Sequence, residues 1–152
     1  MKKIFIVFGG ILVALVIIGI IVFGIIAIKG SALDKECKAY IDKVTPIILS
    51  NLKKETLFLY AGDQLINSAK PEEFGKIFRW FSNLGKFKEY QGSKGQVNVS
   101  ITTQSGKVIT GYYEAKAEFE TGPATIKMIT IKKGDDWKII GFQIYSTALV
   151  NK

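Results

Sequence analysis

The side chains available for acid–base chemistry in this 152-residue chain are carboxylates, lysines and tyrosines, because the sequence contains no histidine. Its one cysteine, Cys37, has no imidazole to activate it, and a single cysteine allows neither an internal disulfide nor a zinc site of the usual ligand count. An enzyme built from these residues would need a pocket carboxylate that keeps its proton, or a tyrosine that donates one. The residues of these two types that are candidates for such a pocket are Asp63, Glu114, Glu118, Tyr112, Tyr113 and Tyr145.

Alternation along the segment from residue 112 to 119 separates these candidates by face. Glu114 and Glu118 share the polar phase, so we predict that they face solvent, while Tyr113 and Phe119 fall on the apolar phase, which we expect to line a pocket. Together with Trp80, these two aromatic residues are the predicted ligand-binding residues, and no residue is predicted to be catalytic.

Asp135 and Asp136 lack the spacing of a calcium loop and are explained as turn residues. No metal and no cofactor is therefore predicted. The net charge of +8 falls to 18 − 13 = +5 without Lys2, Lys3 and Lys29, and the remaining lysines are interspersed with acids. Because no basic stripe results, nucleic acid is not a predicted partner.

A 25-residue stretch from Ile4 to Ile28 contains no charged residue. As a helix it would extend about 37 Å, enough to cross the hydrocarbon core of a bilayer. A cleaved signal peptide is the alternative, since Lys2 and Lys3 form a basic start and small residues follow Lys29, but its apolar region should be only about 7 to 15 residues long. The sequence therefore predicts an uncleaved anchor that holds the protein in the lipid bilayer.

The predicted topology is a single pass through the cell membrane with the C-terminal domain outside the cytoplasm, periplasmic or extracellular. A very short basic tail before a first apolar segment normally stays in the cytoplasm, although lysines occur on both sides of this segment. Gly10 and Ala14 form a small-xxx-small pair that could bring two copies together as a homodimer. Two parts follow: a cytoplasmic tip and anchor over residues 1–30, and a domain over residues 31–152.

Helices are predicted in the first half of that domain. From Leu33 to Ile48 apolar residues recur with a period of 3.6, with Cys37 and Ile47 inside the buried stripe and Pro46 on the polar side. A short helix is expected around Glu55 to Tyr60. A third helix begins at Pro71 and exits at Gly85, with Trp80 at the edge of its apolar stripe. The predicted members of that stripe are Phe74, Ile77, Phe78, Phe81 and Leu84.

After Gly85 the period changes to two, which is typical of half-buried strands. Val97, Val99 and Ile101 mark the apolar face of one strand. The strands over residues 124–132 and 137–145 are apolar on both faces more often, so they are predicted to be central in the sheet or to have a second covered face. Four segments rich in glycine are predicted as hairpin turns, and they span residues 92–95, 104–106, 121–123 and 133–136. Helices followed by strands predict an α+β domain in which three helices pack on an antiparallel sheet of four to five strands.

Two segments resemble the nuclear transport factor 2-like superfamily, also described as a cystatin-like fold. Asn51 to Tyr60 is similar to the second-helix region of those proteins, and Gly134-Asp-Asp-Trp-Lys-Ile139 is similar to their closing hairpin. The resemblance covers Leu33 to Leu149 and implies a cone-like domain whose curved sheet leaves a pocket at its open end. The superfamily includes small membrane-anchored members without known activity. No catalytic motif of its enzymatic members occurs in this sequence.

The sequence thus predicts a membrane-anchored extracytoplasmic binding or assembly module that engages a protein partner or a small apolar ligand. The alternative is a pocket enzyme of the isomerase or dehydratase type that uses a carboxylate or a tyrosine. An acidic or phenolic group that points into the pocket would favour the enzyme.

Overall fold

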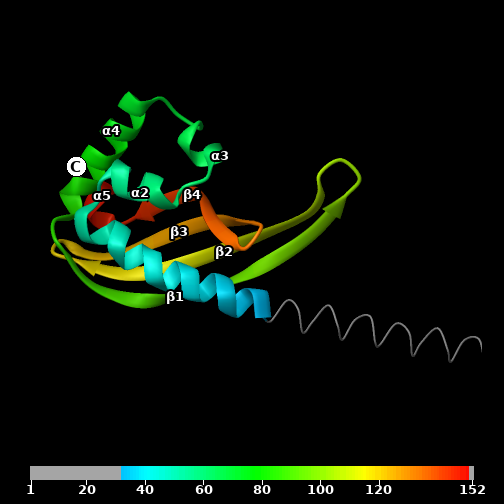
Figure 1. Ribbon diagram of the computed structural model, residues 1–152. Helices are drawn as coiled ribbons and strands as arrows, with labels where there is room; N and C mark the ends of the chain where they lie inside the picture. The colour runs from blue at the N-terminus through cyan, green and yellow to red at the C-terminus, as the bar shows by residue number, and fades with distance from the viewer. Residues whose placement is uncertain (1–31, 151–152) are drawn as a thin grey trace, which may run out of the picture. The chain divides into compact units, whose positions relative to one another are not determined.

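The computed structural model describes residues 32–150, which fold as an α+β domain with a four-stranded antiparallel sheet (Figure 1). The fold described below belongs to the compact unit Asp34–Lys152. The predicted anchor, Ile4 to Ile28, lies outside the described residues. Within residues 32–150 no helix has both the length and the apolar character needed to cross a membrane.

The helices precede the sheet, as predicted, and one short helix follows it. The first helix covers residues 32–51 and continues through Pro46. The others are α2 (Lys54–Tyr60), α3 (Asp63–Ile66), α4 (Pro71–Phe81), a 3-10 turn (Ser82–Leu84) and α5 (Thr147–Val150), the last of which the sequence did not indicate.

Helix α4 confirms its predicted start and exit. Pro71 occupies its first turn, and the backbone N–H of Lys70 donates to the Glu73 carboxylate at 2.9 Å, which satisfies a donor that the helix leaves free. Gly85 ends the segment with φ of 75°, a conformation that residues with a side chain rarely adopt.

The sheet is a meander in the order β1-β2-β3-β4, with every neighbouring pair antiparallel. Its strands are β1 (Phe87–Thr102), β2 (Gly106–Phe119), β3 (Gly122–Lys133) and β4 (Asp136–Tyr145). Gly106, Gly122 and Gly134 have positive φ at the three connections, which confirms the predicted turns there.

The fourth predicted turn, at residues 92–95, is wrong. Ser93 pairs with Ala115 and Gly95 with Tyr113, so the segment belongs to one continuous strand β1. The local irregularity is a register shift between Tyr90 and Ser93, with Gly92 at φ of 91°, and it bends the strand without ending it. The sheet therefore has four strands and not five.

The core lies between the sheet and the first helix, whose predicted stripe is largely confirmed. Cys37 is fully buried, as predicted for a small buried hydrophobic residue, and Phe78 and Phe81 of α4 are 7% and 4% exposed. Thr45 is also fully buried. Its hydroxyl is satisfied there because it donates to the Ile41 carbonyl oxygen at 2.7 Å. Two predictions are wrong: Ile47 and Ile77 lie at the margins of their stripes and are each 41% exposed.

Asp42 ties the first helix to the first strand. Its carboxylate accepts hydrogen bonds from Tyr90 at 2.7 Å, Ser93 at 2.6 Å and Lys38 at 2.5 Å. Desolvation raises the pKa of Asp42, but the donated hydrogen bonds together outweigh it and hold this pKa below its ordinary value of 3.8. The same desolvation, with the Asp42 carboxylate beside it, raises the pKa of the Tyr90 phenol.

The predicted half-burial of Val99 and Ile101 is wrong, although both lie in a strand as expected. They are 44% and 79% exposed. The β2–β3 pairing begins only at Thr110, so the β1–β2 hairpin extends beyond the rest of the sheet (Figure 1). The alternation of a strand shows which side chains share a face, but it does not show whether another element covers that face.

Candidate functional site

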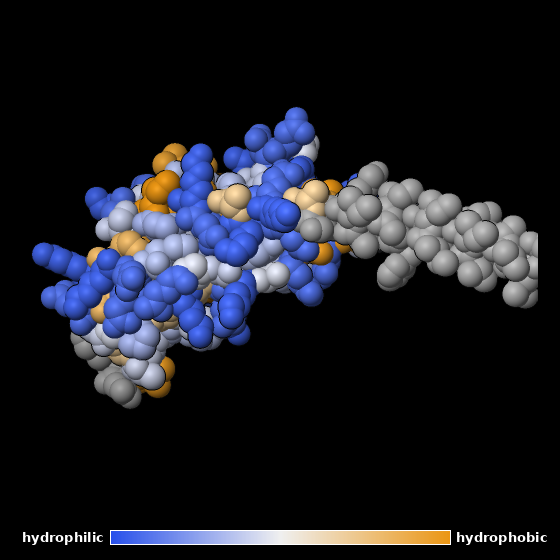
Figure 2. All heavy atoms as spheres, turned by 90° about the horizontal axis from the view of Figure 1, so that it is seen from below, coloured by the Kyte–Doolittle hydropathy of each residue, from blue (hydrophilic) through white to orange (hydrophobic). Residues whose placement is uncertain are grey.

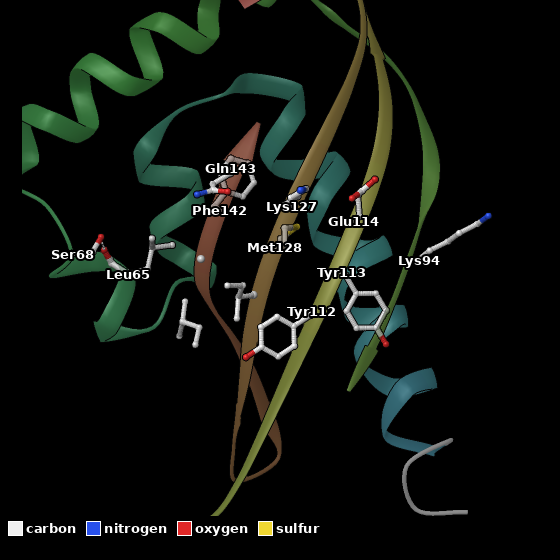
Figure 3. Close-up of a pocket in the computed structure, with 13 residues that line it drawn as sticks. Leu65, Ser68, Lys94, Tyr112, Tyr113, Glu114, Lys127, Met128, Phe142 and Gln143 are labelled. Carbon is white, nitrogen blue, oxygen red and sulfur yellow. Dashed lines mark hydrogen bonds between the residues drawn. The ribbon is translucent and has the colours of Figure 1, made fainter. Parts of the chain in front are cut away.

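A groove with a volume of about 570 Å³ opens on the face of the sheet opposite the first helix (Figure 3). We call it the outer-face groove. Its floor comes from the outward-pointing residues of β2 and β3, and its sides come from β4 and from α3. The residues that line it are Leu65, Ser68, Lys94, Tyr112, Tyr113, Glu114, Lys127, Met128, Ile129, Ile140, Gly141, Phe142 and Gln143.

The floor is hollow because one row of the sheet ends in a glycine. Tyr112 pairs with Ile129, and Ile129 pairs with Gly141, so the three share a face on successive strands. A Cβ at Gly141 would lie 3.2 Å from three Ile129 side-chain atoms, so the Ile129 side chain lies against this glycine. Next to this row, β4 carries an extra residue, Ile140, in a bulge between the pairs Ile129–Gly141 and Thr130–Ile139.

Helix α3 forms a wall because the segment before it is fixed to β4. The N–H of Gly62 donates to the Ile139 carbonyl oxygen at 2.8 Å, and Ala61 forms a parallel bridge with Ile139. This attachment places Leu65, which is 7% exposed, and Ser68 beside the groove. A Cβ at Gly62 would lie 3.3 Å from Ile140, so the approach is close.

A polar row crosses all four strands beside the apolar floor. Lys94 pairs with Glu114, Glu114 with Lys127, and Lys127 with Gln143, so an acidic residue lies between two lysines in the row. Lys127 also lies 5.1 Å from the centre of the Tyr145 ring, within the range of a cation–π contact. The groove thus has an apolar floor, and positively charged, negatively charged and amide side chains lie along one side of it.

Two large side chains of the groove lining remain accessible. Tyr112 is 45% exposed and Ile129 36% exposed. Among residues 32–150 no three His, Cys, Asp or Glu side chains are grouped so that they could hold a metal ion. Glu114 faces outward, as the strand phase predicted, but this is the face on which the groove lies.

The three predicted ligand-binding residues are not brought together. Trp80 is 45% exposed and lines a second pocket of about 470 Å³ with Ile144, Tyr145 and Leu149. Phe119 is fully buried and lines neither pocket, because its ring packs against Phe87 with centroids 5.8 Å apart.

Tyr113 lies at the floor of the outer-face groove but is only 5% exposed. Its hydroxyl donates to the Asp34 carbonyl oxygen at 3.0 Å, beneath the first helix, and this burial raises the pKa of the phenol. The side chains of the apolar phase of β2 therefore face the first helix, and the ligand role of Tyr113, which still lines the groove, stays a prediction. A ligand role for Trp80 stays a prediction.

Sequence reasoning did not place Tyr112 among the ligand-binding residues and did not single out Ile129, and both line the groove. Tyr112 was noted only as a possible proton donor, since it shares the polar phase with Glu114. The available signal was the apolar character of both faces of β3 and β4, which pointed to a second covered or functional face.

Cys37 is not a reactive group. Burial raises the pKa of its thiol to about 11, and a hydrogen bond with Thr130, 3.3 Å away, offsets this only in part. The thiol is therefore protonated at neutral pH and inaccessible, which excludes it as a nucleophile.

Comparisons with protein-family models, curated proteins and solved structures find no match for this chain.

Proposed function

We propose that this chain is a single-pass membrane protein whose α+β domain lies outside the cytoplasm and binds a protein partner at the outer-face groove. The observation that carries the proposal is the accessible pair Tyr112 and Ile129 beside the side-chain-free Gly141. Large apolar side chains that stay accessible on a polar face are typical of interaction sites. Figure 2 shows a face of the domain that is predominantly hydrophilic, with few hydrophobic patches.

A protein side chain suits this groove better than a small free ligand does. Small-molecule sites bury about 70–90% of their ligand in a concave cavity. The outer-face groove leaves Tyr112 and Ile129 accessible along an open face, and tyrosine is enriched where protein partners meet. The row from Lys94 to Gln143 would then supply polar contacts at the rim. A small apolar ligand remains the second occupant to test.

The membrane part of the proposal depends on the uncharged run from Ile4 to Ile28 and the basic start before it. The order of elements, helices and then an antiparallel meander, agrees with the proposed relationship to the nuclear transport factor 2-like superfamily. If this relationship holds, the domain is curved and cone-like, and it stays attached to its anchor.

One observation favours the enzyme alternative. Glu114 and Tyr112, a carboxylate and a phenol, both line the groove, and groups of these types are what an isomerase or dehydratase would need. NMR titration of the carboxyl groups of the domain distinguishes the two functions. A groove carboxyl group that keeps its proton near neutral pH would favour the enzyme.

Site-specific photo-cross-linking in cells tests the binding proposal. Tyr112 is replaced by the photoreactive phenylalanine derivative p-benzoylphenylalanine, which preserves the aromatic ring. The matched control carries the same residue at Leu59, which is 72% exposed on α2 and does not line the groove. We expect a discrete protein adduct from position 112 and none from position 59.

Second-site substitutions make the test specific. Ile129→Asp should abolish the adduct from position 112, because it places a charge on the apolar floor, whereas Leu59→Asp should leave the adduct intact. Equal adducts from positions 112 and 59, or an adduct unaffected by Ile129→Asp, would contradict the proposal. The absence of any protein adduct would favour the small ligand.

A further inference from the structure

The β1–β2 hairpin has a terminal part that no third strand supports. Thr110 of β2 is the first of its residues to pair with β3, whereas β1 and β2 continue to pair out to Thr102 and Gly106. Among the described residues, Val99 to Ile109 therefore form a two-stranded projection, which we call the hairpin tip. Figure 1 shows it extending away from α2, α3 and α4. Two strands alone are marginally stable in water, so we expect a projection of this length to be stabilised by a contact outside the domain.

One face of the tip is apolar and accessible. Val99 pairs with Ile109, and Ile101 pairs with Lys107, so these four side chains lie on the same face. Ile101 is 79% exposed and Val99 44% exposed. Strand propensity explains β-branched residues at such positions in part, but threonine is also β-branched and would expose less apolar surface there.

The contacts of the first helix show which way the tip points. Asp42 accepts hydrogen bonds from Tyr90 and Ser93, while Asp34, two turns earlier in the helix, accepts one from the N–H of Val97 at 2.5 Å. Moving backward along the helix therefore corresponds to moving forward along β1. The hairpin tip projects from the end of the domain at which the chain enters Asp34.

The chain before Asp34 limits how far that end can be from a membrane. Asp34 follows closely after Ile28, the last residue of the uncharged run. The chain segment that joins these two residues is at most about 20 Å long when fully extended. From Val97, level with Asp34, the strand to Thr102 reaches about 16 Å before the turn begins. The hairpin tip is thus long enough to span most of the greatest distance that the segment from Ile28 to Asp34 allows between the domain and the membrane. If that segment is less extended, the distance is shorter.

The charge of the tip suits an anionic lipid surface. Between Glu89 and Glu114 the sequence contains no acidic residue, and its only charged residues are Lys94 and Lys107. Anionic headgroups attract such a segment and repel one that carries carboxylates. An apolar side chain beside a lysine is also the composition that enters the headgroup boundary of a bilayer.

We propose that the hairpin tip, centred on Val99, Ile101 and Lys107, inserts into the headgroup region of the membrane that holds the anchor. The inference rests on the proposed membrane anchor, which it extends with a second contact. Two contacts with one bilayer fix the tilt of the domain and keep the outer-face groove at a defined height and direction.

Lipid quenching of a fluorophore tests the proposal on the full chain. The protein carries Cys37→Ala and one new cysteine, Ile101→Cys, labelled with an environment-sensitive fluorophore and reconstituted into phosphatidylcholine–phosphatidylglycerol vesicles. The matched control is labelled at Lys76→Cys, an exposed position on α4. We expect a blue-shifted emission that headgroup-spin-labelled lipid quenches at position 101, and neither effect at position 76.

A charge substitution separates insertion from mere proximity. With the label moved to Gln104→Cys, Ile101→Glu should remove the quenching, whereas Leu59→Glu on α2 should leave it unchanged. Replacing phosphatidylglycerol by phosphatidylcholine should weaken the quenching, because Lys107 loses its anionic partners.

Flotation of the same vesicles distinguishes the two ways in which the proposal can fail. Protein that floats with vesicles and resists alkaline carbonate, yet shows no quenching at position 101, refutes the hairpin contact and leaves the anchor intact. Protein that does not float refutes both. Disulfide cross-links between copies of the unlabelled Ile101→Cys variant, without lipid quenching, would show instead that the tip contacts a second copy of the chain.

Discussion

Replacing Gly111 by alanine should destabilise the domain, although a glycine-to-alanine change in a strand is often neutral or favourable. A Cβ at Gly111 would lie 2.5 Å from the Cys37 sulfur and 2.6 Å from the Thr130 hydroxyl oxygen. The first distance is 3.4 − 2.5 = 0.9 Å shorter than an ordinary contact. Both obstructing residues are fully buried, so neither can turn into solvent.

The expected loss follows from two opposing effects. Overpacking of this kind costs about 1–3 kcal/mol, while the reduced freedom of the unfolded chain returns about 0.4–1 kcal/mol. We therefore expect Gly111→Ala to lower the free energy of unfolding by about 1–2 kcal/mol. Gly75→Ala is the matched control: Gly75 lies inside α4 with no atom near its Cβ position, so alanine should raise that free energy by about 0.5–1 kcal/mol.

Urea unfolding of a fragment of residues 32–152, followed by circular dichroism, measures both changes. In a Cys37→Ala background the nearest obstructing atom is absent, so the penalty of Gly111→Ala should shrink by at least about 0.5 kcal/mol. A stabilising Gly111→Ala, or a penalty that stays the same in that background, would refute the close approach of the first helix to β2.

Three further predictions use the same fragment. The pKa of Asp42 is held below 3.8, so its stabilising effect should be complete above about pH 4 and lost as the pH falls through its folded-state pKa. Asp42→Asn should therefore reduce the loss of unfolding free energy at acidic pH by about 1 kcal/mol. An unchanged loss at acidic pH would count against the three hydrogen bonds to Asp42. Cys37, with a pKa of about 11, should react with a thiol reagent at pH 7.5 only as fast as the domain unfolds, and rapid labelling of the native protein would show that it is accessible. Phe81→Ala should cost about 3–5 kcal/mol, because its ring is 4% exposed and packs against Phe78 and Phe142; a loss below about 1 kcal/mol in urea unfolding would mean that this packing is wrong.

Local periodicity was sufficient to predict the first helix, α2, α4 and most strands, because burial on one side imposes a repeat of 3.6 or two on the sequence. Pro71 and Gly85 mark the two ends of α4 through backbone chemistry that acts within a few residues. The turns at Gly106, Gly122 and Gly134 follow from the same kind of local signal. These features require no knowledge of what packs against them.

Features set by distant contacts could not be predicted in this way. Gly92 and Gly95 resemble turn residues locally, but pairing of β1 with β2 and the hydrogen bonds to Asp42 and Asp34 keep the strand continuous. The outer-face groove depends on Gly141 and on the bulge at Ile140, and neither changes the apolar pattern of β4. The sequence therefore indicated which face of β2 is polar, but not that the pocket lies on that face.

The proposed function places the domain outside the cytoplasm on an uncleaved anchor, and the hairpin contact requires that this anchor is retained. Labelling of Lys76→Cys, in a Cys37→Ala background, with a membrane-impermeant maleimide on intact cells measures this directly when combined with the intact mass of the membrane-extracted protein. Our account predicts labelling without lysis and a mass that begins at Met1. Labelling only after lysis, or a soluble form that begins near Leu33, would contradict it.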